Sequence, residues 1–340
     1  MLAAICTAYG APDVVQLREV ETPVPKDKDV LIRIHATTVS SGDCRIRGAN
    51  FPIGFGVMAR LVFGASRPRQ PILGTECSGV IEAVGEGVTR WRMGDAVLVS
   101  ARELTQRGGC YAEVIVVPQD APYPLHPTVA FEDAVSLPNL QLALALMRVA
   151  GTSHRPQPHV LITGASGGVA GMLCQVAKHR GFATIGTSRT ADKSQYARDH
   201  GFDHVVCTEQ DDLKTQIQTL TQGRGVDLVF DHLGGQSLID GLHSLASLGT
   251  VVSYNIVQGM PTDDVFQVLR KFLGKSLAVR CFSMHTFDED PLARRALMQE
   301  AIELMAQGLV RPPEHQIFKL SEVRQTHALL DQGRVSGKLV

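Results

Sequence analysis

The feature that most constrains the fold is a glycine-rich turn between an apolar strand and a helix. The strand 160–163 runs directly into Gly164, Ala165, Ser166, Gly167, Gly168 and Val169, and a helical stretch follows to about residue 181. Such a turn aims free backbone N–H groups and the positive end of the helix at one point, which suits a diphosphate. Glycines matter there because a Cβ would keep the phosphates or the helix at a distance. The alternative interpretation is an ordinary tight turn.

A second strand favours the dinucleotide interpretation and indicates which dinucleotide binds. It covers residues 182–189 and follows the helix at the spacing of a dinucleotide-binding unit. NAD-binding sheets usually end this strand in Asp or Glu, which binds the adenosine ribose. Here it ends in Ser188 and Arg189, with Lys193 close behind, and this cationic group suits a 2′-phosphate. We therefore expect NADPH as the cofactor, and a solvated cationic loop is the alternative.

Two textures divide the rest of the chain. Between Val30 and Val117, short β-branched stretches alternate with Gly and Pro, as in an all-β barrel or sandwich, and segment 44–71 interrupts them as an irregular surface loop. After Pro127, a helix that ends near Gly151 precedes several strand–helix alternations with almost continuously apolar strands. Such strands indicate a parallel sheet covered on both faces. The predicted fold class is α/β, with a β-rich domain beside a doubly wound parallel sheet.

Composition and charge exclude several classes of protein. The chain has 340 residues, enough for about two domains, and 44% of them are hydrophobic. Lys and Arg number 33 against 34 Asp and Glu, so no basic field exists that would hold nucleic acid. No apolar run is long enough to cross a bilayer, and the N-terminus does not resemble a signal peptide. The seven cysteines are scattered without a CxxC pair, so we expect reduced thiols and a cytoplasmic protein.

Several motifs occur in an order typical of one known family. They are Ser41-Gly42-Asp43 with Arg45 and Gly48, the stretches 71–85, 94–97, 108–113, 165–170 and 225–227, Asp231 with 234–235, and the final Gly337-Lys338. On these motifs the chain resembles zinc-independent members of the medium-chain dehydrogenase/reductase superfamily, on the quinone oxidoreductase (zeta-crystallin-like) and enoyl reductase branch. The resemblance runs nearly end to end. It implies a GroES-like catalytic domain of residues 1–125, completed by 270–340, and an inserted Rossmann domain of residues 126–269 that binds NADP.

The resemblance also implies residues of the cofactor and substrate sites. Besides the glycine-rich turn, the cofactor residues are Asn139, Ser188, Arg189, Lys193, Asn255, Phe282, Ser283 and Lys338. The implied substrate-pocket residues are Ser40, Asn50 and Phe51. Related reductases often have a Tyr donor where Asn50 or Phe51 stands here, and the alignment leaves both open. Phe51 would stack on a substrate without donating a proton, whereas Asn50 is able to donate.

The same comparison argues against a metal. Zinc alcohol dehydrogenases that resemble this chain carry a Cys in the first active-site loop and a His in the second, and these positions are Ser40 and Thr75 here. A catalytic zinc needs several such ligands at one point. The close cysteines of a structural zinc lobe near residue 100 are missing too, so we expect no metal. Asp43 and Glu76 are then interpreted as loop-fixing or buried structural carboxylates.

Without a metal or a nucleophile–base pair, the chemistry must come from the cofactor, as hydride transfer to an electrophilic carbon. A quinone or an α,β-unsaturated carbonyl suits such a site, because its carbonyl delocalises the developing charge. The expected function is therefore a zinc-free, NADPH-dependent reductase of such small molecules. A 2-enoyl thioester (CoA or ACP) reductase is one alternative, and a non-catalytic NADPH-binding protein with a structural or sensing role is another.

The sequence also suggests how copies of the chain assemble. The apolar stretch 250–257 is the last clear strand of the predicted parallel sheet and would leave an exposed edge. Relatives of this kind usually pair through such an edge, so we expect a homodimer, with a tetramer as the alternative. Neither nucleic acid nor a membrane is an expected partner.

Overall fold

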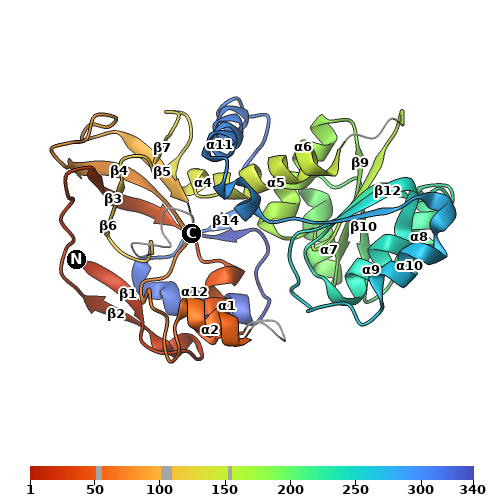
Figure 1. Ribbon diagram of the computed structural model, residues 1–340, viewed down its shortest axis with the longest axis horizontal. Coiled ribbons are helices and arrows are strands. Elements are labelled where there is room, and N and C mark those ends of the chain that lie inside the picture. The colour runs from red at the N-terminus through yellow and green to blue at the C-terminus, as the bar shows by residue number, and fades with distance from the viewer. Residues whose placement is uncertain (51–55, 101–108, 152–154) are drawn as a thin grey trace. The chain divides into compact units, whose positions relative to one another are not determined.

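The computed structural model describes residues 1–50, 56–100, 109–151 and 155–340. The chain forms two compact units, each with its own sheet (Figure 1). One unit, named the split unit, consists of Met1–Pro138 together with Ile302–Val340, and the other, the inserted unit, is Asn139–Ala301. The chain passes from one unit to the other inside two helices, α5 (Leu137–Ala150) and α11 (Pro291–Ala306).

Six parallel strands in the order β10-β9-β8-β11-β12-β13 form the sheet of the inserted unit. In chain order they are β8 (His159–Ile162), β9 (Ala183–Ser188), β10 (His204–Cys207), β11 (Val226–Asp231), β12 (Leu245–Ser253) and β13 (Ala278–Cys281). The accompanying helices are α6 (Gly168–His179), α7 (Ala191–Asp199), α8 (Leu213–Leu220), α9 (Gly235–Ser244) and α10 (Val265–Lys271), with the 3-10 turns η2 (Leu273–Lys275) and η3 (Met284–Asp288). The order runs outward from β8 to one edge, and then from β11 to the other. This is the doubly wound order of a Rossmann sheet, so the predicted fold class is confirmed.

Burial explains why these segments form strands and helices. All six positions of β11 are buried, because helices cover both faces of the sheet. Strand residues Leu161, Val229 and Val251 share one apolar core with the helix residues Ile217 and Leu242. Burying a side chain of this size contributes about 1.5–3 kcal/mol. The core therefore fixes the strand ends from which the loops of the cofactor site emerge.

One prediction about this sheet is wrong. The apolar stretch 250–257 was expected to be the edge, but β12 ends at Ser253 and pairs with β11 on one side and β13 on the other. β13 has only four residues, of which Ala278, Arg280 and Cys281 are exposed, so it lacks the apolar pattern that marks a buried strand. β13 forms a strand because the fold brings it beside β12, and not because of its local sequence. It is the edge strand of the sheet.

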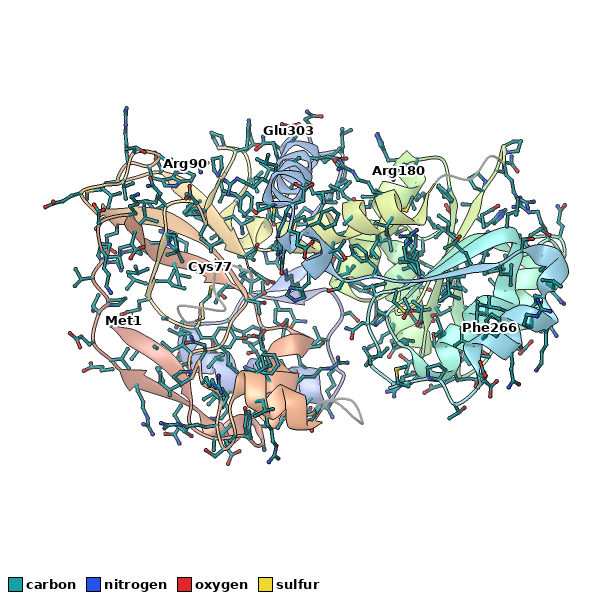
Figure 2. The ribbon with its side chains drawn as sticks, in the orientation of Figure 1. Met1, Cys77, Arg90, Arg180, Phe266 and Glu303 are labelled. Atoms are coloured by element: carbon teal, nitrogen blue, oxygen red, sulfur yellow. The ribbon has the colours of Figure 1, made fainter. Side chains whose placement is uncertain are left out.

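The split unit is built on a five-stranded antiparallel sheet in the order β6-β3-β4-β5-β7. Its strands are β3 (Asp29–Thr37), β4 (Glu76–Val84), β5 (Ala96–Ser100), β6 (Val114–Pro118) and β7 (Tyr123–Pro124), and two small sheets pair β1 (Leu2–Cys6) with β2 (Val15–Glu19) and β14 (His315–Gln316) with β15 (Lys338–Leu339). Its remaining helices are α1 (Ser41–Gly48), α2 (Gly56–Phe63), α4 (Phe131–Ala134) and α12 (Val323–Asp331), with η1 (Pro12–Val14) and η4 (Leu320–Glu322). Ile32, Cys77 and Val99 lie in its core, where Figure 2 labels Cys77. The predicted β-rich domain is confirmed.

Segment 44–71, expected to be an irregular loop, contains helical structure instead. α1 begins after Ser40, whose hydroxyl accepts from the Asp43 N–H while the Asp43 carboxylate accepts from the Ser40 N–H. This reciprocal pair is a capping box, which satisfies backbone donors at a helix start. The Gly and Pro content of the segment obscured that local pattern. α2 follows at Gly56–Phe63.

The seven cysteines are free, six of them buried and Cys281 exposed. Across residues 1–50, 56–100, 109–151 and 155–340, no helix combines the length and the apolar character needed to cross a bilayer.

Candidate cofactor site

The glycine-rich turn lies at the carboxyl end of β8 and is tied to the neighbouring strand β9. Gly164 has φ +65°, and its N–H donates to the Thr187 hydroxyl at 3.4 Å. The next amide, that of Ala165, donates to the Thr187 carbonyl at 2.8 Å. A Cβ at Gly164 would lie only 2.1 Å from Cε1 of His232. Both the backbone angle and the close ring therefore require glycine at this position.

The start of α6 presents donors without acceptors. Its N-cap is Gly167, which makes no side-chain cap bond. In the part of the chain that the structure describes, no acceptor pairs with the amide N–H of Ser166, Gly168 or Val169. The first amides of any helix lack intrahelical partners, and the helix dipole adds positive potential there. The turn therefore fits a diphosphate, as the sequence predicts.

The tip of β9 carries a cationic pair. Ser188 is buried, Arg189 is exposed with Nε 3.5 Å from the Glu209 carboxylate, and Lys193 is half-buried on α7. No described residue forms a hydrogen bond or ion pair with the Lys193 ammonium. Burial, and after it the neighbouring Arg189 charge, lower the pKa of Lys193. An anion between these two cations would relieve both costs, so the tip fits a 2′-phosphate.

The carboxyl end of β11 supports the turn from the other side. The buried Asp231 accepts from the Thr163 hydroxyl at 3.2 Å, from the Gly234 N–H at 2.8 Å and from the Ser237 hydroxyl at 2.7 Å. His232 Nδ1 donates to the Thr163 carbonyl at 3.1 Å, which holds its ring against the turn. None of these residues was predicted from the sequence as part of the cofactor site. The clue in the sequence is that Thr163 and His232 directly follow apolar strands and Asp231 ends one, at the edge where the ends of parallel strands meet.

The remaining predicted cofactor residues fall into two groups. Asn255 follows β12, and Phe282 and Ser283 follow β13, so all three lie at the carboxyl edge of the sheet with the turn. Phe282 is nearly buried, whereas Asn255 and Ser283 are exposed. Asn139 is half-buried in α5, away from the strand ends in sequence. Their contacts with a cofactor stay predictions.

Lys338 belongs to the split unit and is engaged inside it. Its ammonium, 8% exposed, donates to Glu76 Oε1 at 3.1 Å and to the Val135 carbonyl. The hydroxyls of Thr38 and Thr75 also donate to the Glu76 carboxylate. A buried carboxylate is tolerated when it is paired and hydrogen-bonded in this way. Lys338 therefore neutralises Glu76 in this structure, and its predicted role at the cofactor stays a prediction.

The predicted substrate-pocket residues are also in the split unit. The Ser40 hydroxyl donates to Asp43 Oδ2 at 2.5 Å, and the other Asp43 oxygen accepts from the Gly74 N–H at 3.1 Å. Burial raises the pKa of Asp43, whereas the hydrogen bonds from Ser40 and Gly74 favour its ionised form, and these bonds tie the two loops together. Asn50 is exposed just after α1, and Phe51 lies outside the described residues. In the described part of the chain, no three His, Cys, Asp or Glu side chains gather as metal ligands.

The inserted unit therefore defines a dinucleotide-binding protein of the doubly wound class. Two protein-family models match the chain: "Alcohol dehydrogenase GroES-like domain" over residues 26–127, and "Zinc-binding dehydrogenase" over residues 168–307. A quinone oxidoreductase of Pseudomonas aeruginosa is 27% identical over 334 residues, covering 98% of this chain and 97% of that protein. The Sus scrofa quinone oxidoreductase is 29% identical over 98% of this chain and 94% of its own length.

Solved structures agree with these relatives. The Escherichia coli quinone oxidoreductase complexed with NADPH superimposes with a TM-score of 0.83 at 25% identity, and 100% of both chains is covered. A quinone oxidoreductase from Pseudomonas syringae pv. Tomato gives the same TM-score, identity and coverage. The chain belongs to the medium-chain dehydrogenase/reductase superfamily, on the quinone oxidoreductase and enoyl reductase branch.

Proposed function

We propose that this protein is a zinc-free, NADPH-dependent reductase that transfers hydride to a quinone or an α,β-unsaturated carbonyl. Relatives over the whole length carry the name quinone oxidoreductase, and the Escherichia coli structure was solved with NADPH. The observation in this chain that carries the proposal is the pair Arg189 and Lys193, at a strand tip where a carboxylate would mark NAD.

The chain's own residues account for cofactor binding. The free amides of Ser166, Gly168 and Val169 bind the diphosphate, while Gly164 keeps the turn close to the sheet. Arg189 and Lys193 bind the 2′-phosphate, and Ser188 lies at the same tip. When bound, the nicotinamide supplies the hydride, and the protein supplies orientation and electrostatics.

The sequence places the domain boundaries near residues 125 and 270, whereas the compact units divide after Pro138 and after Ala301. We therefore assign the GroES-like catalytic domain to the split unit and the NADP-binding domain to the inserted unit, which includes β13. Ser40, Asn50 and Phe51 belong to the substrate pocket of the first. The two matching family models, over residues 26–127 and 168–307, support this assignment. Thr75 and Ser40 replace two usual zinc ligands, so the reaction proceeds without a metal.

The proposed setting is the cytoplasm, where the free cysteines stay reduced. The partner is a small-molecule substrate, and the protein is a homodimer or a tetramer built from dimers.

The test is substrate-dependent oxidation of NADPH, followed by the loss of absorbance of the reduced nicotinamide. A panel should contain quinones, enones and enoyl thioesters, each with and without a chelator. We expect turnover with quinones or enones, unchanged by the chelator. Turnover with enoyl thioesters alone would support the thioester reductase instead. NADPH binding without turnover on any member would leave a structural or sensing role.

A further inference from the structure

A cavity in the inserted unit lies at the opposite end of the sheet from the cofactor turn. It measures about 400 Å³, within the usual range of small-molecule pockets. Pro158 directly precedes β8 and Phe182 directly precedes β9, so the cavity is at the amino ends of the strands. The glycine-rich turn follows the carboxyl end of β8. The cavity is therefore separate from the site proposed for NADPH.

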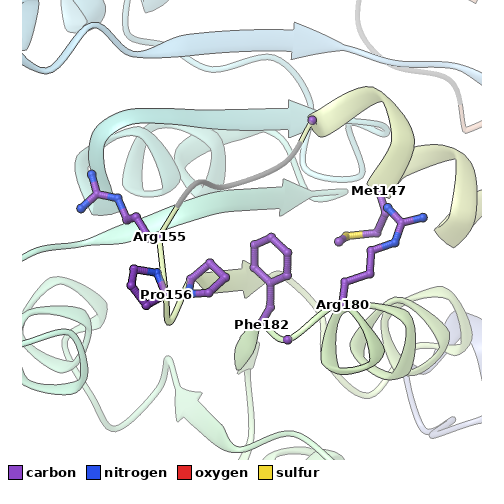
Figure 3. A pocket seen from close by; sticks show the side chains of 8 residues that line it. Met147, Arg155, Pro156, Arg180 and Phe182 are labelled. Carbon is purple, nitrogen blue, oxygen red and sulfur yellow. The ribbon is translucent and has the colours of Figure 1, made fainter.

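The floor of this cavity is apolar. Met147 and Phe182 are 1% and 7% exposed, and Pro158 is also buried. Figure 3 shows the Phe182 ring in the centre, with Pro156 on one side and Met147 on the other. An aromatic face beside proline rings and a thioether favours a flat apolar group over water.

The rim of the cavity is cationic. Arg180 rises beside Met147 at one end, and Arg155 stands at the other with its guanidinium turned outward (Figure 3). Arg155 is paired with Asp227 at 2.8 Å, and its charge is largely compensated.

Arg180 is in a different position from Arg155. No described residue makes a hydrogen bond or ion pair with its guanidinium. The charged groups that influence it electrostatically are Glu300 and Arg148, which form an ion pair with each other. Burial, more than the Arg148 charge, lowers the pKa of Arg180, and Glu300 opposes that shift. Arg180 is thus a cation beside an apolar floor, and its carboxylate neighbour Glu300 is already paired with Arg148. Such a cation is suited to bind an anion.

We propose that this cavity binds an aromatic carboxylate, with its ring on Phe182 and its carboxylate on Arg180. A planar guanidinium matches a carboxylate with two parallel hydrogen bonds. Inorganic phosphate or acetate offers the charge but leaves the apolar floor in contact with water. An uncharged aromatic fills the floor but leaves Arg180 without a partner. Only a ligand with both parts satisfies both surfaces.

The experiment is isothermal titration calorimetry with benzoate on the full chain, in the presence of saturating NADPH. We expect millimolar or tighter binding, which corresponds to about −4 kcal/mol. Arg180→Gln should weaken benzoate about tenfold or more, while Arg270→Gln, an exposed arginine of α10 in the same unit, should leave it unchanged. Benzyl alcohol and acetate should each bind about tenfold or more weakly than benzoate, since each lacks one half of the ligand.

A charge reversal provides a second, independent variant. Arg180→Glu should lose benzoate and bind benzylamine, because the geometry is retained with the opposite sign. Both variants should keep the NADPH affinity of the wild type, which shows that the unit is folded. Absence of benzoate binding at about 10 mM would overturn the proposal. So would benzoate binding that survives Arg180→Gln, phosphate binding of equal strength, or displacement of benzoate by NADPH.

Discussion

At the scale of single residues, the choice of cofactor rests on two cations. Each charge-assisted hydrogen bond to a phosphate is worth about 1.5–3 kcal/mol, less where solvent screens it. Arg189 is exposed and shares its charge with Glu209, whereas Lys193 is half-buried. Arg189→Ala together with Lys193→Ala should therefore weaken NADPH about 100-fold, measured by titration of the cofactor fluorescence.

NADH is the internal control for this double variant, because it has no 2′-phosphate and its affinity should hardly change. Arg198→Ala removes an exposed arginine of α7 away from the strand tip and should leave both affinities as they are. A wild type that binds NADH as tightly as NADPH would show that this strand tip has been misinterpreted.

A second residue-scale feature makes stability depend on pH. His327 is completely buried, and its Nδ1 lies 3.2 Å from the Cys44 sulfur. Burial raises the pKa of Cys44 to about 12, so a protonated thiol faces the imidazole. Burial, and then the Arg47 charge, lower the pKa of His327 from 6.5 to about 4.

The sign of the effect follows from proton binding. Between pH 4 and 6.5, His327 is mostly protonated in the unfolded chain and mostly neutral in the folded chain. The contribution to stability is complete above pH 6.5 and declines as the pH falls toward 4. Near pH 5 the loss is about 2 kcal/mol relative to pH 7.5, measured by urea unfolding. His327→Asn should remove about that much of the difference between the two pH values, whatever its effect on absolute stability. An unchanged pH dependence would contradict this assignment.

At the scale of elements, sequence patterns predicted those structures whose residues carry their own pattern. Apolar runs and glycines predicted the strands between Val30 and Val117, the turn at Gly164 and the buried strands of the parallel sheet. β13 was not predicted, because its exposed residues form a strand only by pairing with β12. The helix α1 was missed although Ser40 and Asp43 form its capping box. Local sequence thus predicted the buried strands of both sheets, whereas it missed the strand that depends on pairing.

The site follows the same division. The turn and the strand tip were predictable because their chemistry is local in sequence. Asp231 and His232 were not assigned to the site, because they reach the turn across the sheet, through Thr163. Lys338 was placed at the cofactor by resemblance, and its ion pair with Glu76 joins residues far apart in the sequence. Contacts of this range depend on the assembled fold.

The turn itself offers an element-scale prediction. Gly164→Ala places a Cβ at φ +65° and 2.1 Å from the His232 ring, so the turn must shift. It should lower the thermal unfolding temperature and weaken NADPH and NADH alike, since both share the diphosphate. Gly171→Ala is the matched control, because its Cβ meets nothing within 4 Å. That change in a helix should stabilise by up to about 1 kcal/mol. Equal stability of the two variants would show that the ring contact does not constrain the turn.

At the scale of the whole molecule, the exposed strand edge calls for a partner. β13 pairs with β12, and within the described residues nothing pairs with its other side. An open edge next to apolar surface is a template for a further strand. Between β12 and β13 in the sequence, Val257, Met260, Phe266 and Leu273 are each about half exposed or more, and Figure 2 labels Phe266 on α10. If two copies pair through their β13 strands, the two sheets become one continuous sheet, and both β13 edges are covered.

The alternation of the strand selects the variant that tests this dimer. The Phe282 N–H donates to the Ser253 carbonyl of β12, so in a parallel ladder the N–H of Cys281 points to the open side. Cys281→Pro removes that donor and leaves the bonds to β12 in place, since proline is tolerated on an edge strand. We expect the wild type to show twice the mass of one chain, or four times in a tetramer, by light scattering at micromolar concentration, and Cys281→Pro to reduce the pairing. Cys281→Ser keeps the N–H and should assemble as the wild type does, which also excludes a disulfide as the link. A monomeric wild type, or a proline variant that pairs as well as the serine variant, would rule out assembly through this edge.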